Sequence, residues 1–260
     1  MHLHASDDQM ISAKLRQDHC WEAYETELTL THLQPGDIYV DVGANIGYYT
    51  LIAAQRVGTQ GKVFAYEPDP DNFELLKTNV ALNDLSQVQV FPYALYDKNT
   101  DGQLFLSADN FGDHRIYASG DNRSQRNIRL VHGDEHVGQL SEKIDFLKID
   151  TQGAEFFVVN GLKRLIMKNR NYLRMILEFC PYGIRHSGAS GHDLLQLLAD
   201  TGMQYHIVDH QQQCLIAAQR HHLAEWVDKM AGEAHNEGFV NLFITPSGYE
   251  VNAEVATHEI

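Results

Sequence analysis

The stretch Tyr39-Val-Asp-Val-Gly-Ala-Asn-Ile-Gly-Tyr-Tyr-Thr50 decides the fold of this chain of 260 residues. It predicts a buried strand, a tight glycine turn and the start of a helix. The following stretch Ala65-Tyr-Glu-Pro-Asp-Pro-Asp-Asn72 predicts a second strand that ends in an acid. In an α/β sheet such a turn receives a ligand at the helix N-terminus, and the acid accepts hydrogen bonds from ribose hydroxyls. Together they indicate a site for an adenosine-containing cofactor.

The glycine pattern of the turn distinguishes between cofactors. Dinucleotide folds usually carry G-x-G-x-x-G, because a pyrophosphate needs close backbone approach at the second glycine. Here Asn45 takes the second glycine position and Tyr48 the third. Asp41 would repel a pyrophosphate, whereas S-adenosylmethionine brings an ammonium, a sulfonium and no phosphate. The turn therefore favours S-adenosylmethionine; a structural turn without a ligand is the alternative, and an NAD-dependent oxidoreductase ranks last.

Composition and charge narrow the class of protein. With 43% hydrophobic residues, the chain is expected to form one domain with a substantial core. Its formal net charge of −15 argues against binding to nucleic acid or to an anionic membrane. The start of the sequence lacks the basic segment and apolar run of a signal peptide, and no apolar run has the length that spans a bilayer. We therefore expect a cytoplasmic protein with neither a nucleic-acid nor a membrane partner.

The order of the predicted elements indicates a mostly parallel sheet, because strands alternate with helices. The predicted strands are 38–42, 62–66, 88–91, 145–149, 174–179, 204–208, 214–217 and 239–245, and one helix is predicted over 154–167. Residues 1–34 are expected to be an irregular lead-in and a helix, 35–246 the cofactor-binding domain, and 247–260 a flexible tail. The apolar helix face within 223–230 is expected to pack on the sheet; a homodimer seam is the minority interpretation.

The ends of the first three predicted strands supply the residues expected around the cofactor, because ligands bind at the carboxyl ends of parallel strands. Glu67 lies 24 residues past Gly43, close to the spacing of about 20 for a ribose acid. Tyr93, Ala94 and Leu95 are placed to flank an adenine. The full set expected to bind the cofactor is Asp41, Gly43, Ala44, Asn45, Gly47, Glu67, Pro68, Tyr93, Ala94 and Asp150.

Acids also follow the next two strands. Asp150, Glu155 and Glu178 are expected to converge on the outer half of the cleft. An alcohol acceptor needs a base to take its proton, and Asp150 is the first candidate. Alternatively Asp150 only caps the following helix, and Glu155 only complements the helix dipole. Glu178 is harder to explain without a function, because a buried carboxylate is costly without a partner. Lys148 and Asp150 are interpreted as marking the point where the strand stops being buried.

These motifs also resemble one family. The resemblance is carried by Asp41-Val-Gly-Ala-Asn-Ile-Gly-Tyr-Tyr-Thr50, Glu67-Pro-Asp-Pro, Asp145-Phe-Leu-Lys-Ile-Asp-Thr-Gln-Gly-Ala-Glu155 and Leu177-Glu-Phe, which are similar in order and spacing to the FkbM-type methyltransferases over roughly residues 35–245. It implies a class I, Rossmann-like methyltransferase fold with a seven-stranded, mostly parallel sheet and helices on both faces. It also implies S-adenosylmethionine as cofactor and O-methylation of a hydroxyl, with macrolides and sugars among the family's acceptors.

By the same resemblance, the cofactor is held by Asp41, Gly43, Asn45, Gly47 and Glu67, and Asp150 faces the acceptor. The chain departs from the pattern at one point, since Tyr93 and Ala94 stand where this fold often has an acid near the adenine. Contacts to the adenine are therefore less well defined by the resemblance than contacts to the ribose.

The polar segment from Ala108 to Gly138 is long, which in a compact domain is typical of a functional loop or lid. In it His114 is a candidate base near neutral pH, although a solvated loop with incidental polarity is the plainer interpretation. His132 and His136 would share a helix face, but Gly133 and Gly138 disfavour a helix there. No convincing carboxylates accompany the histidines, so we expect no metal; magnesium between Asp150 and Glu178 is an outside alternative.

The resulting prediction is an S-adenosylmethionine-dependent O-methyltransferase that acts on a hydroxyl of a small sugar or secondary metabolite. One rival is the same fold methylating a nitrogen or a carboxylate, which an intact rate in Asp150→Asn would favour. A rival of another class is a cofactor-binding module without transferase activity.

Overall fold

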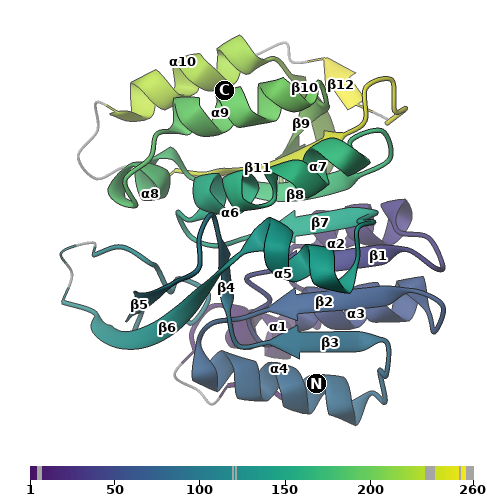
Figure 1. The fold of residues 1–260 in the computed structure, drawn as a ribbon, viewed down its shortest axis with the longest axis vertical. Coiled ribbons are helices and arrows are strands. Elements are labelled where there is room, and N and C mark those ends of the chain that lie inside the picture. The colour runs from purple at the N-terminus through teal and green to yellow at the C-terminus, as the bar shows by residue number, and fades with distance from the viewer. Residues whose placement is uncertain (5–7, 119, 121, 232–237, 252, 256–260) are drawn as a thin grey trace.

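The central sheet contains the strands that the sequence predicts and is extended at one edge. The computed structural model describes residues 1–4, 8–118, 120, 122–231, 238–251 and 253–255. Within these residues nine strands form the sheet (Figure 1). In spatial order they are β12 (Ala253–Val255), β10 (Cys214–Ala218), β9 (Gln204–Asp209), β11 (Val240–Thr245), β8 (Arg174–Phe179), β7 (Phe146–Ile149), β1 (Ile38–Val42), β2 (Lys62–Tyr66) and β3 (Val88–Phe91).

The strand order confirms the class I fold. From β3 to β9 the sheet runs β3-β2-β1-β7-β8-β11-β9, and β11 is antiparallel to both of its neighbours. The expectation of seven strands was too low for the described residues, because β10 pairs antiparallel with β9 and β12 pairs parallel with β10. β12 falls in the segment expected to be a flexible tail. Residues 252 and 256–260 of that segment lie outside the described residues.

Helices cover both faces of the sheet, because successive strand side chains point to opposite sides. Tyr39 packs toward one face and Val40 toward the other. The first face is covered by α2 (Ala23–His32), α3 (Tyr48–Val57) and α4 (Pro70–Leu82). The second is covered by α5 (Gly133–Leu140), α6 (Glu155–Gly161), α7 (Lys163–Asn169), α9 (Gly191–Thr201) and α10 (Arg220–Ala231). Two further helices are α1 (Ile11–Asp18) and α8 (Pro181–His186).

A small second sheet stands beside the main one (Figure 1). Its strands are, in spatial order, β4 (Ala94–Tyr96), β6 (Ser124–His132) and β5 (Thr100–Leu106). Tyr96, Leu104, Ile128 and Leu130 form its own apolar cluster. Because β4 directly follows β3 through a short turn, this sheet is attached next to the carboxyl ends of the main strands, where it can form one wall of a site.

Four local predictions were wrong. Residues 1–20 are not uniformly irregular, since α1 lies within them. The segment 108–138 is not one loop, because its second half contains β6 and most of α5. Gly133 does not prevent that helix and is its first residue. A Cβ there would lie 2.8 Å from Leu162 Cγ, so the absence of a side chain allows α5 to pack against the turn after α6. The single helix predicted over 154–167 breaks at Leu162 into α6 and α7.

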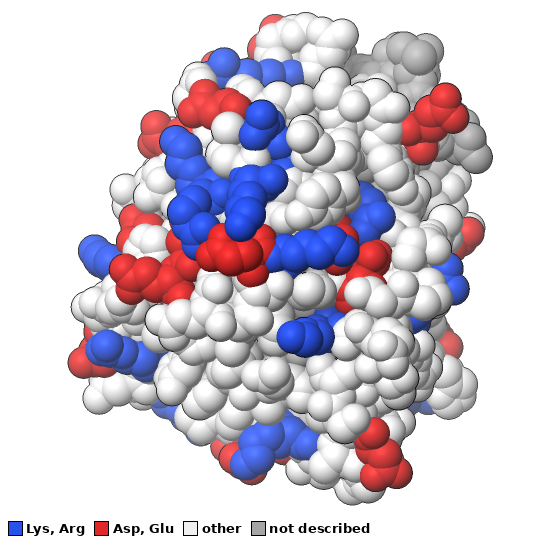
Figure 2. Space-filling view, turned by 45° about the vertical axis from the view of Figure 1, so that its right-hand side comes forward, with Lys and Arg blue, Asp and Glu red and all other residues white. Residues whose placement is uncertain are grey.

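The surface carries both signs of charge. On the face shown in Figure 2, basic side chains meet acidic ones instead of forming a patch of one sign. On α7, Arg164 and Lys168 both pair with Glu142, at 2.7 and 2.9 Å. Among the described residues we find no helix with the length and apolar character needed to cross a membrane.

Candidate active site

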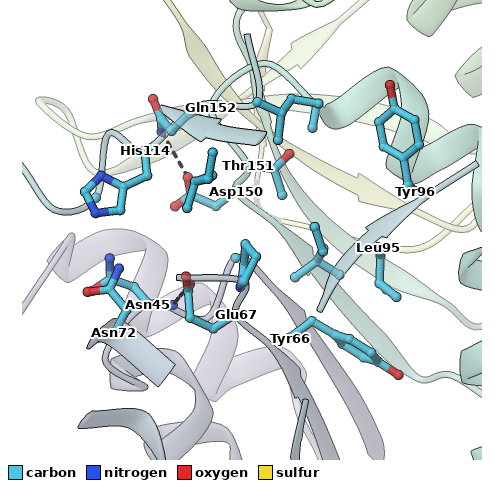
Figure 3. Close-up of a pocket in the computed structure, with 18 of the residues that line it drawn as sticks. Asn45, Tyr66, Glu67, Asn72, Leu95, Tyr96, His114, Asp150, Thr151 and Gln152 are labelled. Atoms are coloured by element: carbon cyan, nitrogen blue, oxygen red, sulfur yellow. Dashed lines mark hydrogen bonds between the residues drawn. The ribbon is translucent and has the colours of Figure 1, made fainter. Parts of the chain in front are cut away.

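A cavity of about 720 Å³ lies at the carboxyl ends of β1, β2 and β7. Asp150, Thr151 and Gln152 border it on one side, and Asn45, Asn72 and Glu67 on the other (Figure 3). The predicted site residues that line it are Gly43, Asn45, Glu67, Pro68, Ala94, His114 and Asp150. Leu95, expected beside the adenine, lines it too, whereas the sequence did not single out several others: Ile11, Tyr66, Asn72, Tyr96, Phe111, Gly112, Ile116, Thr151 and Gln152.

The glycine turn after β1 is held by close backbone packing. Gly43 has a φ of 84°, and its N–H donates to the Tyr66 carbonyl oxygen at 3.0 Å. A Cβ at Gly43 would lie 1.8 Å from the Asp150 carbonyl oxygen, so any side chain would push β1 away from β7. Glycine is therefore required here by both conformation and space.

Glu67 is fixed by the backbone of the same unit. Its Oε2 accepts from the Asn45 N–H and its Oε1 from the Asp69 N–H, both at 2.8 Å. The side chain is 5% exposed, and burial raises its pKa to about 8 although both hydrogen bonds favour the ionised form. Each carboxylate oxygen has a second lone pair, so Glu67 can accept further hydrogen bonds from a ligand in the cavity.

Asn45 stands where a dinucleotide fold has its second glycine. It adopts a φ of 50°, a left-handed conformation that asparagine tolerates better than most residues. Its side-chain amide donates to the Phe111 carbonyl oxygen at 2.9 Å, and Asn72 donates to the same oxygen at 3.2 Å. The two asparagines thus tie the segment around Phe111 down over the cavity.

Three residues expected at the cofactor lie behind the cavity instead of lining it. Asp41 is 1% exposed and accepts a hydrogen bond from the Thr50 hydroxyl at 2.6 Å; burial raises its pKa to about 6. Ala44 packs with Leu76 in the core. A Cβ at Gly47 would lie 2.6 Å from Leu76 Cδ1, so this glycine allows α4 to approach the turn.

The wall after β3 is apolar. Ala94, Leu95 and Tyr96 line the cavity together with Leu104 and Leu130 of the second sheet. Tyr93, expected beside the adenine, does not line it; its ring packs against His136 with the centroids 5.6 Å apart. His136 in turn shares a hydrogen bond of 2.9 Å with the Tyr66 hydroxyl. Of the three residues expected beside the adenine, Ala94 and Leu95 line the cavity and Tyr93 does not.

Asp150 is held by a buried lysine. Lys148 Nζ donates to Asp150 Oδ2 at 2.9 Å, and Gln152 donates to Oδ1 at 3.2 Å. Burial acts to raise the pKa of Asp150, but Lys148 and these hydrogen bonds outweigh it and lower that pKa to about 2. Lys148 itself is only 3% exposed, so the expectation that the strand leaves the core here was wrong.

The pKa of Glu178 is shifted in the opposite direction. Its Oε2 accepts from Gln152 at 2.6 Å, which bridges it to Asp150. Burial and the neighbouring Asp150 carboxylate raise the pKa of Glu178 well above its usual range. Glu178 therefore holds its proton to a higher pH than Asp150 does. The structure brings these two acids together, as the sequence predicted.

Glu155 lies behind the cavity and does not line it. It is fully buried, and one oxygen accepts from the Gly153 N–H at 2.8 Å and the Thr151 hydroxyl at 3.0 Å. Its other oxygen has no hydrogen-bond partner among the described residues. Burial raises its pKa to about 7. From its position behind the cavity, Glu155 thus holds the loop that contains Asp150 and Gln152.

His114, in the segment predicted to be a loop or lid, borders the cavity. Its Nδ1 accepts from the Ser107 N–H at 3.1 Å, so the neutral ring carries its proton on Nε2. Burial lowers the pKa of His114 and favours this neutral form. The next residue, Arg115, forms an ion pair with Asp113 at 2.6 Å.

A second cavity of about 960 Å³ adjoins the first. Both are lined by Ile11, Gly112, Asp150 and Gln152. The second one is also lined by Trp21, Glu22, Arg115, Tyr117, Glu178, Cys180, Tyr182 and Phe239. A Cβ at Gly112 would lie 2.6 Å from Ile11 Cδ1, so these two residues are in close contact where the two cavities adjoin. No local pattern in the sequence marks Ile11 or Glu22 as part of a site.

Among the described residues, one group of three brings potential metal ligands together: Glu22, Glu25 and His210, with ligand atoms within 4.8 Å of one another. None of them belongs to the histidine pairs or to the Asp150–Glu178 pair considered from sequence. Lys148 Nζ lies 3.6 Å from Glu25, and its ammonium already supplies a positive charge there. We assign no metal ion to this group.

The side chains that line the first cavity suit a nucleoside that carries a positively charged sulfur better than they suit a dinucleotide. Glu67 can accept from ribose hydroxyls, and the wall after β3 offers apolar contact for a base. No lysine or arginine is among the described residues that line this cavity. A pyrophosphate would therefore meet no cationic side chain, whereas a positively charged ligand would meet the Asp150 carboxylate.

Comparisons with known proteins agree with this chemistry. Residues 41–205 match the family model described as the methyltransferase FkbM domain. A hexuronic acid methyltransferase, AglP of Haloferax volcanii, is 27% identical over 185 residues, which cover 69% of each chain. The 31-O-demethyl-FK506 methyltransferase FkbM of Streptomyces tacrolimicus is 35% identical over 79 residues, 30% of this chain and 28% of that protein. The crystal structure of methyltransferase FkbM from Methylobacillus flagellatus is 15% identical with a TM-score of 0.48, over 93% of this chain and 56% of that one.

Proposed function

The chain belongs to the FkbM family of S-adenosylmethionine-dependent methyltransferases, and on this premise we propose that it methylates a hydroxyl of a small sugar or secondary-metabolite acceptor. The observation that carries the proposal is the shared boundary of the two cavities. Asp150 and Gln152 line both of them. A methyl donor in the first cavity and a hydroxyl in the second would meet at these residues.

We assign the first cavity to the cofactor. When bound, S-adenosylmethionine supplies the methyl group on a positively charged sulfur. Glu67 would accept hydrogen bonds from the ribose, with Gly43 and Asn45 forming the floor beside it. Ala94 and Leu95 would contact the adenine. Asp41, Ala44 and Gly47 would contribute by shaping the turn from behind.

We assign the second cavity to the acceptor. Trp21, Tyr182 and Phe239 offer aromatic surfaces, and Phe239 is 52% exposed. Polar groups lie between them, including Glu22, Arg115 and Glu178. Aromatic faces combined with hydrogen-bonding groups suit a ring that carries several hydroxyls, since rings present an apolar body and a polar edge. The names of the two relatives above specify a hexuronic acid and a position on FK506, which supports an oxygenated small molecule.

Asp150 would orient the acceptor instead of removing its proton. An acid with a pKa of about 2 is ionised at neutral pH but is a weak base. As a fixed anion it accepts a hydrogen bond from the hydroxyl and lies close to the positive charge of the donor. Holding the two reacting groups in line provides much of the rate of such a displacement.

The low basicity of Asp150 also favours a second candidate, transfer to a nitrogen or carboxylate, which needs no strong base. Because Asp150 is assigned here to orientation and not to proton removal, Asp150→Asn does not separate the two candidates, and the acceptor that the wild type methylates does. A panel of sugars, macrolides, amines and carboxylates, assayed for S-adenosylhomocysteine release, would identify the class directly. Turnover only on amines or carboxylates would contradict the hydroxyl assignment, and no turnover with any acceptor would favour a cofactor-binding module.

The cofactor assignment is tested by calorimetry with S-adenosylhomocysteine and NAD. At pH 9, where Glu67 is ionised, we expect S-adenosylhomocysteine to bind and Glu67→Ala to weaken it by about 10- to 100-fold, since hydrogen bonds to a charged group contribute about 1.5–3 kcal/mol. Glu74→Ala is the matched control, because Glu74 lies exposed on α4, away from the cavity, and forms a surface ion pair with Lys77. Equal binding by the two variants would contradict the ribose contact.

A further inference from the structure

One carboxylate of the acceptor cavity comes from a segment outside the predicted domain. Glu22 directly precedes α2 and lines the cavity together with Asp150 and Glu178. It lies before residue 35, where the cofactor-binding domain was expected to begin, and before residue 41, where the family match begins. Its position in the cavity therefore results from how α1 and α2 fold back over the carboxyl edge of the sheet.

The backbone at Glu22 is strained. It has a φ of 43° and a ψ of 66°, in the left-handed region that glutamate rarely adopts. Such conformations cost about 1–2 kcal/mol and are concentrated at functional sites. The first turn of α2 and the Tyr49 hydroxyl hold the residue: the Thr26 N–H donates to the Glu22 carbonyl oxygen at 2.9 Å, and the Tyr49 hydroxyl donates to Oε2 at 3.0 Å.

Glu22 and Asp150 differ in their hydrogen bonds to Lys148. Lys148 bonds Asp150 directly at 2.9 Å, whereas the Glu22 carboxylate accepts a hydrogen bond from the neutral Tyr49 hydroxyl. Burial raises the pKa of Glu22, and the charge of Lys148 only partly offsets it. Glu22 therefore takes up a proton more readily than Asp150. The titratable and charged groups around it are Glu25, Tyr49, Lys148, Asp150 and His210.

Behind Glu22 a short chain of polar groups leads to the surface. Potential proton-carrying atoms of Glu22, Glu25 and His210 lie within 4.8 Å of one another. Glu25 is 1% exposed and is held by Asn241, which donates to its Oε2 at 2.7 Å. His210 Nε2 lies 3.8 Å from the same oxygen, and the His210 side chain is 37% exposed. The path therefore starts at the cavity and ends in solvent.

We propose that Glu22 is the general base that takes the proton of the acceptor hydroxyl, and that Glu25 and His210 conduct this proton to solvent. This rests on the proposed hydroxyl methylation. The acceptor oxygen forms the new bond to the methyl carbon, and the carbon–sulfur bond breaks with its electron pair left on sulfur. The hydroxyl proton passes to the Glu22 carboxylate and then through Glu25 to His210. Asp150 stays ionised throughout.

Glu22→Gln tests the base. It keeps an acceptor for the Tyr49 hydroxyl and removes the proton-accepting carboxylate. We expect kcat to fall by about 100-fold or more, the usual size of a general-base effect, and the acid limb of the kcat/KM pH profile to disappear. Calorimetric affinity for S-adenosylhomocysteine should stay within about twofold, because the cofactor cavity does not include Glu22. Glu27→Gln, on an exposed position of the same helix, is the matched control and should resemble the wild type.

Carbon-13 carboxyl NMR of the S-adenosylhomocysteine complex supplies a readout that does not depend on turnover. The signal absent from Glu22→Gln should titrate above the range of exposed glutamates. For the exit path, His210→Ala should slow turnover, and added imidazole should restore it. A purely structural role for His210 would not be rescued by a diffusible base.

The possible outcomes distinguish a failure of the base role of Glu22 from a failure of the proposed hydroxyl methylation. Wild type that methylates no hydroxyl acceptor overturns the proposed function, and the base role with it. Wild type that methylates a hydroxyl while Glu22→Gln keeps the wild-type rate and pH profile overturns the base alone. A Glu22 signal that titrates like an exposed glutamate also overturns it.

Discussion

The cofactor side and the acceptor side of the site both present carboxylates, but they hold them by different means. Glu67, on the cofactor side, is held by two backbone N–H groups that lie 22 and 2 residues away in the chain. Glu25, behind the acceptor side, is held by Asn241, which lies 216 residues away, and by buried Lys148. The first arrangement is local and geometric. The second depends on charge balance between distant segments.

This difference predicts which kind of substitution should destabilise each side of the site. The turn around Gly43 leaves no space for a side chain, so changes in shape should damage the cofactor side most. On the acceptor side Glu22, Glu25 and Asp150 lie around Lys148, so changes in charge should damage this side most. Both expectations can be tested through stability, without knowledge of the acceptor.

The largest effect is expected for Gly43→Ala. Its Cβ would lie 1.8 Å from the Asp150 carbonyl oxygen, and the φ of 84° disfavours alanine in addition. We expect a loss of about 4 kcal/mol in the free energy of unfolding, measured by urea denaturation. Gly202→Ala is the control for backbone conformation alone, because Gly202 has a φ of 70° and a ψ of 11°, and a Cβ added there would meet nothing within 4 Å; about 1 kcal/mol is expected there. Equal losses would mean that packing against β7 is unimportant.

Lys148→Met should come next. It removes the cation that faces Asp150 and Glu25 and leaves their carboxylates buried without compensation, at a cost of about 3 kcal/mol. Because burial raises the pKa of Glu25 to about 8, the loss should be larger at pH 9, where that group ionises, than at pH 5. Urea denaturation at both pH values measures this. Lys168→Met, on exposed α7, is the control, and a loss independent of pH would point to packing instead of charge.

The smallest effect concerns Glu67 without ligand. Its pKa is about 8 in the folded protein against an ordinary 4.5, so the folded state holds the proton more tightly. The stability from this group is complete below pH 4.5 and is lost as the pH rises through 8. The amide of Glu67→Gln can accept from only one of the two backbone N–H groups, so the variant should melt a few degrees below wild type at pH 4, and this gap should close at pH 9, where wild-type Glu67 is ionised. The thermal shift of Glu74→Gln provides the baseline, and a melting curve of Glu67→Gln parallel to wild type at every pH would refute the assignment.

Local patterns explain why much of the cofactor side was predictable. The bounds of β1, β2, β3 and β8 match the prediction, because each strand is a short apolar run bounded by turn residues. Gly43 and Glu67 could be placed because parallel strands end at one edge. Asp41 could not, because its charge suggested a ligand contact while the fold turned it toward Thr50.

Long-range packing explains the misses. β6 was not predicted because only its second half alternates apolar and polar residues, with Ile128 and Leu130 buried and Arg129 exposed. Lys148 looked like the end of burial, since the sequence cannot show that Glu25 would come from a helix more than a hundred residues earlier. The expected meeting of Asp150 and Glu178 was correct, because both lie at the carboxyl ends of neighbouring parallel strands.

The contact between Ile11 and Gly112 over the boundary of the two cavities has a kinetic consequence. Both residues line both cavities, so a movement of either one changes the access of donor and acceptor together. Association of one ligand and release of the other then share a step, and their rate constants are not independent. Steady-state patterns with both ligands varied would show this as an obligatory order of addition and departure.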